Sequence, residues 1–374
     1  MKKSAALLVL LAAAGLAQDD PVRLREQAVT LAAQGKYAEA EPLLARALGT
    51  REKELGADDP RLSELIDELA AICRAQARSA EAEKLYLRSV ALKQKALGAE
   101  SPEIIPDLRR LAGLYVGMAR FTDAEQAYLR AIALGVKARG PDDLEVGQDS
   151  AELGRFYISR KRFAAAEPNL RRAIFILERR LGPEDPALVP ALESLASALI
   201  EQENFEPAEA AFHRVISIQE RAFGPSHAEV APHLDKLAML LYNQKRYADS
   251  EKLYRRSLEI WAAVPGADLA SSLDNLAVAC AAQEKYSEAA SLFQTSLAIR
   301  ENGAVKSLSN LALALEGQGK YAAAERQYRL AILIAEKIPG PSPEDTALRA
   351  KIVKNHDALV RKMKGPKVES KTKK

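Results

Sequence analysis

"GKYAEAEPLLARAL" spans residues 35–48, and "GKYAAAERQYRLAI" spans residues 319–332. Three related segments lie between them: "RFAAAEPNLRRAI" from residue 162, "RYADSEKLYRRSL" from 246 and "KYSEAASLFQTSL" from 285. A segment that recurs at a nearly constant spacing is the signature of a repeat architecture. The chain of 374 residues is therefore interpreted as an array before ordinary domains are counted.

One anchor residue in each copy sets the register of the array. The anchors follow one another at 42 residues five times, then at 39 and 35: Tyr37, Ser79, Phe121, Phe163, Phe205, Tyr247, Tyr286, Tyr321. A small residue follows three positions later in every copy: Ala40, Ala82, Ala124, Ala166, Ala208, Ser250, Ala289, Ala324. A large apolar residue comes four positions after that: Leu44, Tyr86, Tyr128, Leu170, Phe212, Tyr254, Phe293, Tyr328. The pattern predicts a helix that begins near the anchor, here named helix B.

A second helix is predicted upstream of each anchor. In the fifth copy the apolar residues are spaced i, i+3, i+4 and i+7, which is one face of an α-helix: Leu192, Leu195, Ala196, Leu199. We name this helix A, and we expect the small residue to lie where helices A and B touch. Glycines spaced by 42 follow helix B, and we expect them in the left-handed conformation that closes a helix: Gly56, Gly98, Gly140, Gly182, Gly224. Three linkers then predict an N-cap with proline at the first helical position: Asp59-Pro60, Ser101-Pro102, Asp185-Pro186.

These units resemble the tetratricopeptide repeat family from Pro21 to about Pro339. With the small residue at the family's position 20, repeats start near residues 21, 63, 105, 147, 189, 231, 270 and 305. Family positions 4, 7, 8 and 11 of the last repeat become Leu308, Leu311, Ala312 and Leu315. The 42-residue spacing and linkers such as "LGPEDP" look like the kinesin light chain subtype. Three positions depart from the family pattern: Gln27, Ser79, Ser150.

The resemblance implies an all-α fold, a right-handed superhelical solenoid of about eight helix-turn-helix repeats over residues 18–340. Stacked repeats bury a continuous core that no single unit could form alone. Residues 341–363 suit a C-terminal capping helix, with one apolar face: Leu348, Ile352, Leu359, Met363. Residues 364–374 are expected to form a disordered, lysine-rich tail.

The first 17 residues have the pattern of a secretory signal peptide. Lys2 and Lys3 precede an apolar run over residues 5–14, and "GLAQ" offers cleavage after Ala17. The run is much shorter than the ~20 apolar residues of a membrane-spanning helix. We expect an exported protein of bacterial type, periplasmic or secreted. The alternative is a protein anchored to the membrane by an uncleaved signal.

The distribution of charge limits the classes of partner that we expect, and the positions of the two cysteines indicate their role. The net charge of +3 depends on the ends of the chain, because the tail carries five lysines against Glu369 and the first segment carries two more. The body between them is slightly acidic, which disfavours nucleic acid as a partner. The tail either keeps the end of the chain solvated or makes weak contact with an anionic surface. Cys73 and Cys280 occupy the same position of two repeats and are predicted to be buried, unpaired fillers.

No catalytic or cofactor motif is present. HExxH, CxxC, G-x-S-x-G, P-loop and G-x-G-x-x-G patterns do not occur in the sequence. His213, His227, His233 and His356 fall on different predicted elements, so we predict no metal site, no cofactor and no enzymatic activity. A metal-dependent hydrolase using residues 213–233 remains the remote alternative.

In the tetratricopeptide family, helix A lines the ligand groove with positions 2, 5, 6, 9, 12 and 13. Position 12 is apolar in repeats three to six: Val116, Ile158, Ile200, Tyr242. Position 6 is Asn275 and Asn310 in the last two repeats, within Asn-Leu-Ala segments like those of kinesin light chains. There, groove asparagines hydrogen-bond the backbone of an extended peptide, while Lys236 and Lys306 stand beside this pair and could attract acidic groups. The alternatives are packing against neighbouring helices for the apolar line and ordinary solvated residues for the polar one.

These observations predict a non-enzymatic scaffold that binds a peptide or protein segment in its groove. The alternative is a structural component of the cell envelope that assembles through contacts between solenoids.

Overall fold

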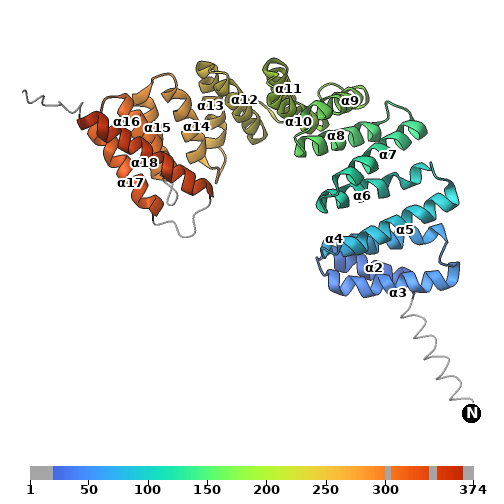
Figure 1. Ribbon diagram of the computed structural model, residues 1–374. Coiled ribbons are helices and arrows are strands. Elements are labelled where there is room, and N and C mark those ends of the chain that lie inside the picture. The colour runs from blue at the N-terminus through green and yellow to red at the C-terminus, as the bar shows by residue number, and fades with distance from the viewer. Residues whose placement is uncertain (1–19, 300–304, 337–342, 365–374) are drawn as a thin grey trace, which may run out of the picture. The chain divides into compact units, whose positions relative to one another are not determined.

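The computed structural model describes residues 20–299, 305–336 and 343–364 (Figure 1). Seventeen α-helices and four short 3₁₀ helices make up the regular structure of these residues, and they contain no strand. The predicted signal segment and the lysine-rich tail lie outside the described residues. The chain divides into two compact units, Met1–Pro183 (unit 1) and Glu184–Lys374 (unit 2), each of which is described by itself.

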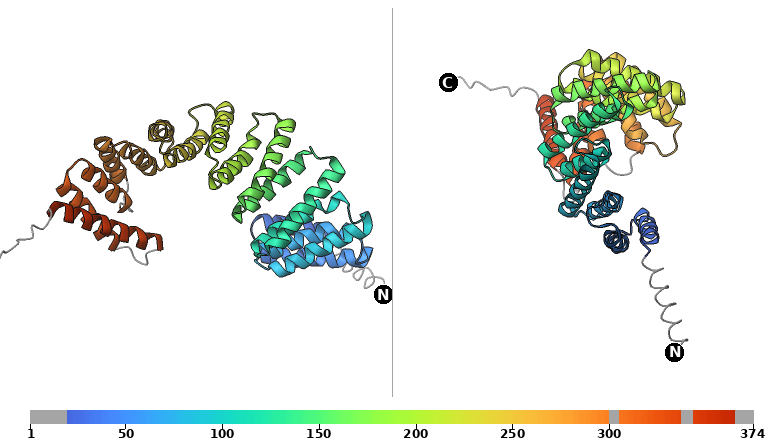
Figure 2. Two further views of the ribbon diagram at one scale, coloured as in Figure 1. Left: turned by 45° about the horizontal axis from the view of Figure 1, so that its top comes forward. Right: turned by 90° about the vertical axis from the view of Figure 1, so that its right-hand side faces the viewer.

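Unit 1 holds four helix pairs that stack one on the next (Figures 1 and 2). The helices A are α2 (Pro21–Ala33), α4 (Ser63–Ala75), α6 (Ile105–Gly117) and α8 (Leu144–Ser159). The helices B are α3 (Tyr37–Leu55), α5 (Ser79–Leu97), α7 (Phe121–Arg139) and α9 (Phe163–Leu181).

Unit 2 holds four further pairs and a final single helix. The helices A are α10 (Val189–Glu201), α12 (Ala231–Asn243), α14 (Leu269–Ala281) and α16 (Val305–Gly317). The helices B are α11 (Phe205–Phe223), α13 (Tyr247–Ala262), α15 (Tyr286–Ile299) and α17 (Tyr321–Glu336). The last helix, α18 (Pro343–Lys364), packs against α17 and α16.

The anchor residue is the first residue of helix B in all eight pairs. The residue two positions before it has a positive φ in every turn, between 55° and 75°: Gly35, Ala77, Ala119, Lys161, Glu203, Lys245, Glu284, Gly319. This left-handed conformation costs a non-glycine residue roughly 1–2 kcal/mol, and six of the eight are not glycine. The turn therefore depends on the packing of the two helices it joins, and no sequence pattern predicted it.

The glycines after helix B differ from the prediction. Gly56, Gly98, Gly140, Gly182 and Gly224 have φ between 88° and 99°, as a glycine allows, but ψ lies between 149° and 164°. This is the extended region at positive φ that only glycine enters readily, not the left-handed helical region. The chain thus leaves helix B in an extended direction and enters the linker.

The linkers also differ in detail. Asp59, Ser101 and Asp185 accept a hydrogen bond as N-caps, as predicted, but each caps a single 3₁₀ turn: η1 (Pro60–Leu62), η2 (Pro102–Ile104), η3 (Pro186–Leu188). A fourth, η4 (Ala228–Val230), is capped by His227. The linker before α8 has no such turn, so Asp143 caps the α-helix itself and α8 begins at Leu144, three residues before the expected start.

The core follows the predicted register. The small residue three positions after each anchor is completely buried in all eight repeats. Burial of a large aliphatic or aromatic side chain stabilises the fold by roughly 1.5–3 kcal/mol, and Leu170, Phe293 and Tyr328 are among the most deeply buried. On α18, Ile352 and Leu359 close the core of unit 2, but Met363, expected on the same face, is 42% exposed.

Cys73 and Cys280 are buried and free, as predicted. Among the described residues, no helix is long and apolar enough to cross a membrane.

Candidate functional site: the exposed face of helices A in unit 2

Polar contacts between successive helices A orient their exposed faces. The Glu193 side chain on α10 lies 2.7 Å from His233 Nδ1 and accepts from Lys236 Nζ at 2.5 Å, both on α12. The hydrogen bond with His233 and the positive charge of Lys236 lower the pKa of Glu193 to about 2, although burial opposes this shift. Lys236 is therefore an exposed cation that already has a carboxylate partner.

The next contact of this kind joins α14 to α16. Ser307 Oγ donates to Asp274 Oδ2 at 2.8 Å, and both residues are buried. Since successive residues of a helix are turned by 100°, Asp274 facing α16 leaves its neighbour Asn275 directed to solvent. Asn275 is exposed and Asn310 is half-buried, and neither carboxamide has a hydrogen bond with any described residue. Lys306 is exposed and forms no ion pair with the described residues.

Two apolar residues on this side were missed by the sequence analysis. Met239 on α12 and Leu313 on α16 are 55% and 44% exposed, and Val278 of α14 lies half-buried at the equivalent position. All three occupy position 9 of their repeats. The sequence did contain a signal for them, because position 9 is expected to face solvent and yet carries an apolar residue in these repeats.

We call the exposed side of α12, α14 and α16 the A-face. It consists of Lys236, Met239, Asn275, Lys306, Asn310 and Leu313. It combines unsatisfied carboxamides, two cations and exposed apolar side chains on three consecutive repeats of unit 2.

The apolar residues at position 12 point outward less than expected. Val116, Ile158, Ile200 and Tyr242 are all half-buried. Tyr242 packs against the core of unit 2, and its ring centroid lies 5.2 Å from that of Tyr247, the next anchor. The first two residues belong to unit 1 and the last two to unit 2, so the structure describes two separate pairs.

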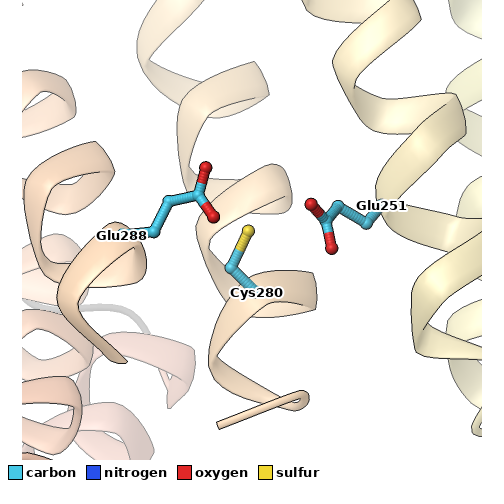
Figure 3. Close-up of side chains that lie close together, drawn as sticks. All are labelled: Glu251, Cys280 and Glu288. Carbon is cyan, nitrogen blue, oxygen red and sulfur yellow. The ribbon is translucent and has the colours of Figure 1, made fainter. Parts of the chain in front are cut away.

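A second group of polar side chains gathers between α13, α14 and α15. Glu251 of α13, Cys280 of α14 and Glu288 of α15 point toward one another, with one ligand atom from each within 4.8 Å of the others (Figure 3). Among the described residues, these three side chains form the group whose ligand atoms lie close enough together to hold a metal ion. The guanidinium of Arg255 already binds both carboxylates, at 2.7 Å from Glu251 and 2.5 Å from Glu288.

The chemistry of this cluster favours a structural role. Burial and the two carboxylates raise the pKa of Cys280 to about 11, so the thiol is protonated near neutral pH and is a poor metal ligand or nucleophile. Burial raises the pKa of Glu251, but hydrogen bonds from Lys285, Arg255 and Gln283 lower it to about 2. The guanidinium of Arg255 therefore takes the place that a metal ion would occupy, and its contacts hold the three helices together.

The histidines proposed for the remote hydrolase alternative have separate surroundings. His213 is exposed and lies 3.7 Å from Glu209. His227 accepts from the Glu229 amide at 3.2 Å and stacks on Phe223. His233 is buried against Glu193, as described above, so the three do not form one site.

Sequence profiles of the tetratricopeptide repeat match residues 23–95, 65–137, 148–221, 229–302 and 305–345. The chain belongs to the tetratricopeptide repeat family. Proteins of this family are generally non-enzymatic scaffolds that bind protein partners. No curated protein matches the chain.

Several solved structures resemble this one at low sequence identity. The apo form of RapI matches with a TM-score of 0.55 and 13% identity, covering 92% of this chain and 98% of that one. BtubC (BKLC) from P. vanneervenii matches with a TM-score of 0.50 and 20% identity, over 60% of this chain and 90% of the other. A putative kinesin light chain from Podospora anserina with nearly identical repeats matches at a TM-score of 0.49 and 23% identity, over 55% and 99%. At these identities the likeness shows the fold alone.

Proposed function

We propose that this tetratricopeptide repeat protein is a non-enzymatic scaffold that binds an extended peptide or protein segment along the A-face. The observation that carries the proposal is the pair Asn275 and Asn310, at equivalent positions of consecutive repeats. Their carboxamides have no hydrogen bond within the described part of the chain. A carboxamide both donates and accepts, so it satisfies a peptide backbone whatever the peptide's side chains.

The neighbouring residues of the A-face add apolar contacts and electrostatic attraction to these hydrogen bonds. Each hydrogen bond to a solvated backbone contributes only ~0.5–1.5 kcal/mol of net affinity, because water is displaced from both partners. Met239 and Leu313 offer apolar surface for side chains of the ligand, and apolar anchors provide much of the free energy of binding. Lys306 would attract acidic residues and mainly increase the rate of association.

We further propose that the scaffold acts after export, with residues 1–17 removed. The motivation is the apolar N-terminal segment with its two lysines and small-residue cleavage site. Mass measurement of the protein from its native host tests this: a chain beginning at Gln18 supports export, and a chain that keeps Met1 in the cytosol contradicts it.

The binding proposal is tested with a peptide selected from a random displayed library against residues 18–374. Asn275→Ala combined with Asn310→Ala should weaken its affinity about 5- to 100-fold, at ~0.5–1.5 kcal/mol for each lost hydrogen bond. Asn204→Ala, in the turn before α11, is the control, because this exposed side chain makes no capping hydrogen bond and lies away from the A-face. Circular dichroism checks that helicity is unchanged.

Equal affinity of the double variant and the wild-type chain would return these asparagines to solvated surface residues. Lys306→Glu separates the electrostatic part, since it should slow association with an acidic peptide at low salt and have little effect at high salt. Lys236 is unsuitable for this purpose because its reversal would also place a negative charge against Glu193.

A further inference from the structure

The C-terminal end of the chain carries an excess of positive charge. Residues 343–374 contain ten Lys and Arg against four Asp and Glu, a net charge of +6. The whole chain has +3, of which Lys2 and Lys3 contribute two, so residues 18–342 have a net charge of −5. Six of the ten basic residues belong to α18 itself.

The basic residues of α18 divide into two sets. Near the core side, Arg349 pairs with Glu336 at 2.6 Å, and Lys362 pairs with Glu316 at 3.4 Å and lies over the ring of Tyr321. These residues fasten the helix to α16 and α17.

The other set faces away from the core. Ile352 and Leu359 are completely buried, and helical geometry places Lys354 and Arg361 on the opposite side, with Lys351 at its edge. All three are exposed, and none has an ion pair with any residue that the structure describes. The exposed residues on the same side are three alanines, which leave the face flat, and one carboxylate, which the three cations outnumber: Ala347, Ala350, Ala358, Asp357.

We propose that this outward side of α18, the basic face, binds the surface of an anionic lipid membrane. Three unpaired cations on one flat helical face complement a layer of negatively charged head groups, and the lysines after residue 364 add to the same attraction. Val353, 36% exposed and at the edge of this face, suits the apolar boundary beneath the head groups. Nucleic acid fits less well, because residues 18–342 have a net charge of −5, whereas a nucleic-acid-binding body usually carries an excess of basic residues.

Vesicle co-sedimentation tests the proposal with residues 18–374, which include every described residue. The probes are vesicles of phosphatidylglycerol with phosphatidylcholine and vesicles of phosphatidylcholine alone, each at low and high salt. The expected result is binding to the anionic vesicles at low salt only. Lys351→Glu, Lys354→Glu and Arg361→Glu together should reduce it on the order of 100-fold, from ~1 kcal/mol for each basic residue near the surface.

A matched triple variant controls for net charge. Lys53→Glu, Lys84→Glu and Lys245→Glu change the total charge equally at exposed positions of other elements and should leave vesicle binding nearly unchanged. Thermal unfolding verifies that both triple variants are folded.

Three outcomes would overturn the proposal. One is equal sedimentation with anionic and neutral vesicles, and another is an equal loss in both triple variants. The third is binding that disappears on removal of residues 365–374 but persists in the α18 variant, which would assign it to the tail. Duplex DNA is run in parallel, and tighter, α18-dependent binding to DNA than to vesicles would replace the membrane with nucleic acid.

Discussion

At the scale of single residues, positive φ angles mark one kind of junction in all eight repeats and a second kind in the first five. In the turn from helix A to helix B, non-glycine residues such as Ala119 adopt the left-handed conformation. After helix B, Gly140 and its equivalents adopt an extended conformation that other residues avoid. The first junction tolerates strain because two packed helices impose it, whereas the second requires glycine.

These junctions predict different responses to substitution in the third repeat. Gly140→Ala should lower stability by roughly 1–3 kcal/mol, although the new Cβ would meet no atom within 4 Å. Ala119→Gly should change stability by less than about 1 kcal/mol, because relief of strain offsets the greater freedom of glycine in the unfolded chain. Urea unfolding measures both, and a neutral Gly140→Ala would show that the linker relaxes without cost.

Glu193 should make part of the stability of unit 2 depend on pH. Its pKa in the folded protein is lowered to about 2, so the stabilisation is fully present above the ordinary value near 4.5 and is lost as pH falls toward 2. Glu193→Gln should therefore unfold at a lower temperature than wild type at pH 7, and the difference should shrink below pH 4. Circular dichroism melts from pH 7 to 2.5 measure this. A constant difference across the range would mean that the contacts with His233 and Lys236 do not hold the ionised form.

At the scale of the helix pair, the small residue three positions after the anchor controls how closely helices A and B approach. Ala208 is completely buried, whereas Ala210, two residues later on α11, is exposed. Ala208→Leu should overpack the contact with α10 and cost roughly 1–3 kcal/mol. Ala210→Leu adds the same atoms in solvent and should change stability by less than about 0.5 kcal/mol. Matching thermal unfolding curves for the two variants would contradict the assigned packing.

At the scale of the whole molecule, repeats depend on their neighbours, and a terminal repeat needs a cover for its apolar side. In unit 2 this cover is α18, through Ile352 and Leu359. Removal of residues 343–374 should expose the core around Tyr328, lower the melting temperature and increase binding of a hydrophobic dye. Removal of residues 365–374 alone should do neither. A truncated chain that melts like the full one would mean that α18 is not a structural cap.

The sequence by itself was sufficient for the fold, and the reason is local. Helical periodicity, the small residue and the anchor recur in each repeat, so the errors of one copy are corrected by the others, and every predicted anchor begins a helix. The limits of this inference appear where local signals change: α8 begins three residues early because its linker lacks the proline turn of its neighbours.

The candidate site was predicted in part. The register placed Asn275 and Asn310 at one equivalent position, and the A-face includes both, together with Lys236 and Lys306. Their role as ligand contacts stays a prediction. Sequence could not show that Lys236 is paired with Glu193, that Tyr242 packs into the core, or that Arg255 joins Glu251 to Glu288. The Lys236–Glu193 and Arg255–Glu288 pairs join side chains 43 and 33 residues apart across stacked repeats, and the burial of Tyr242 depends on the helices around it. Only tertiary packing decides such contacts.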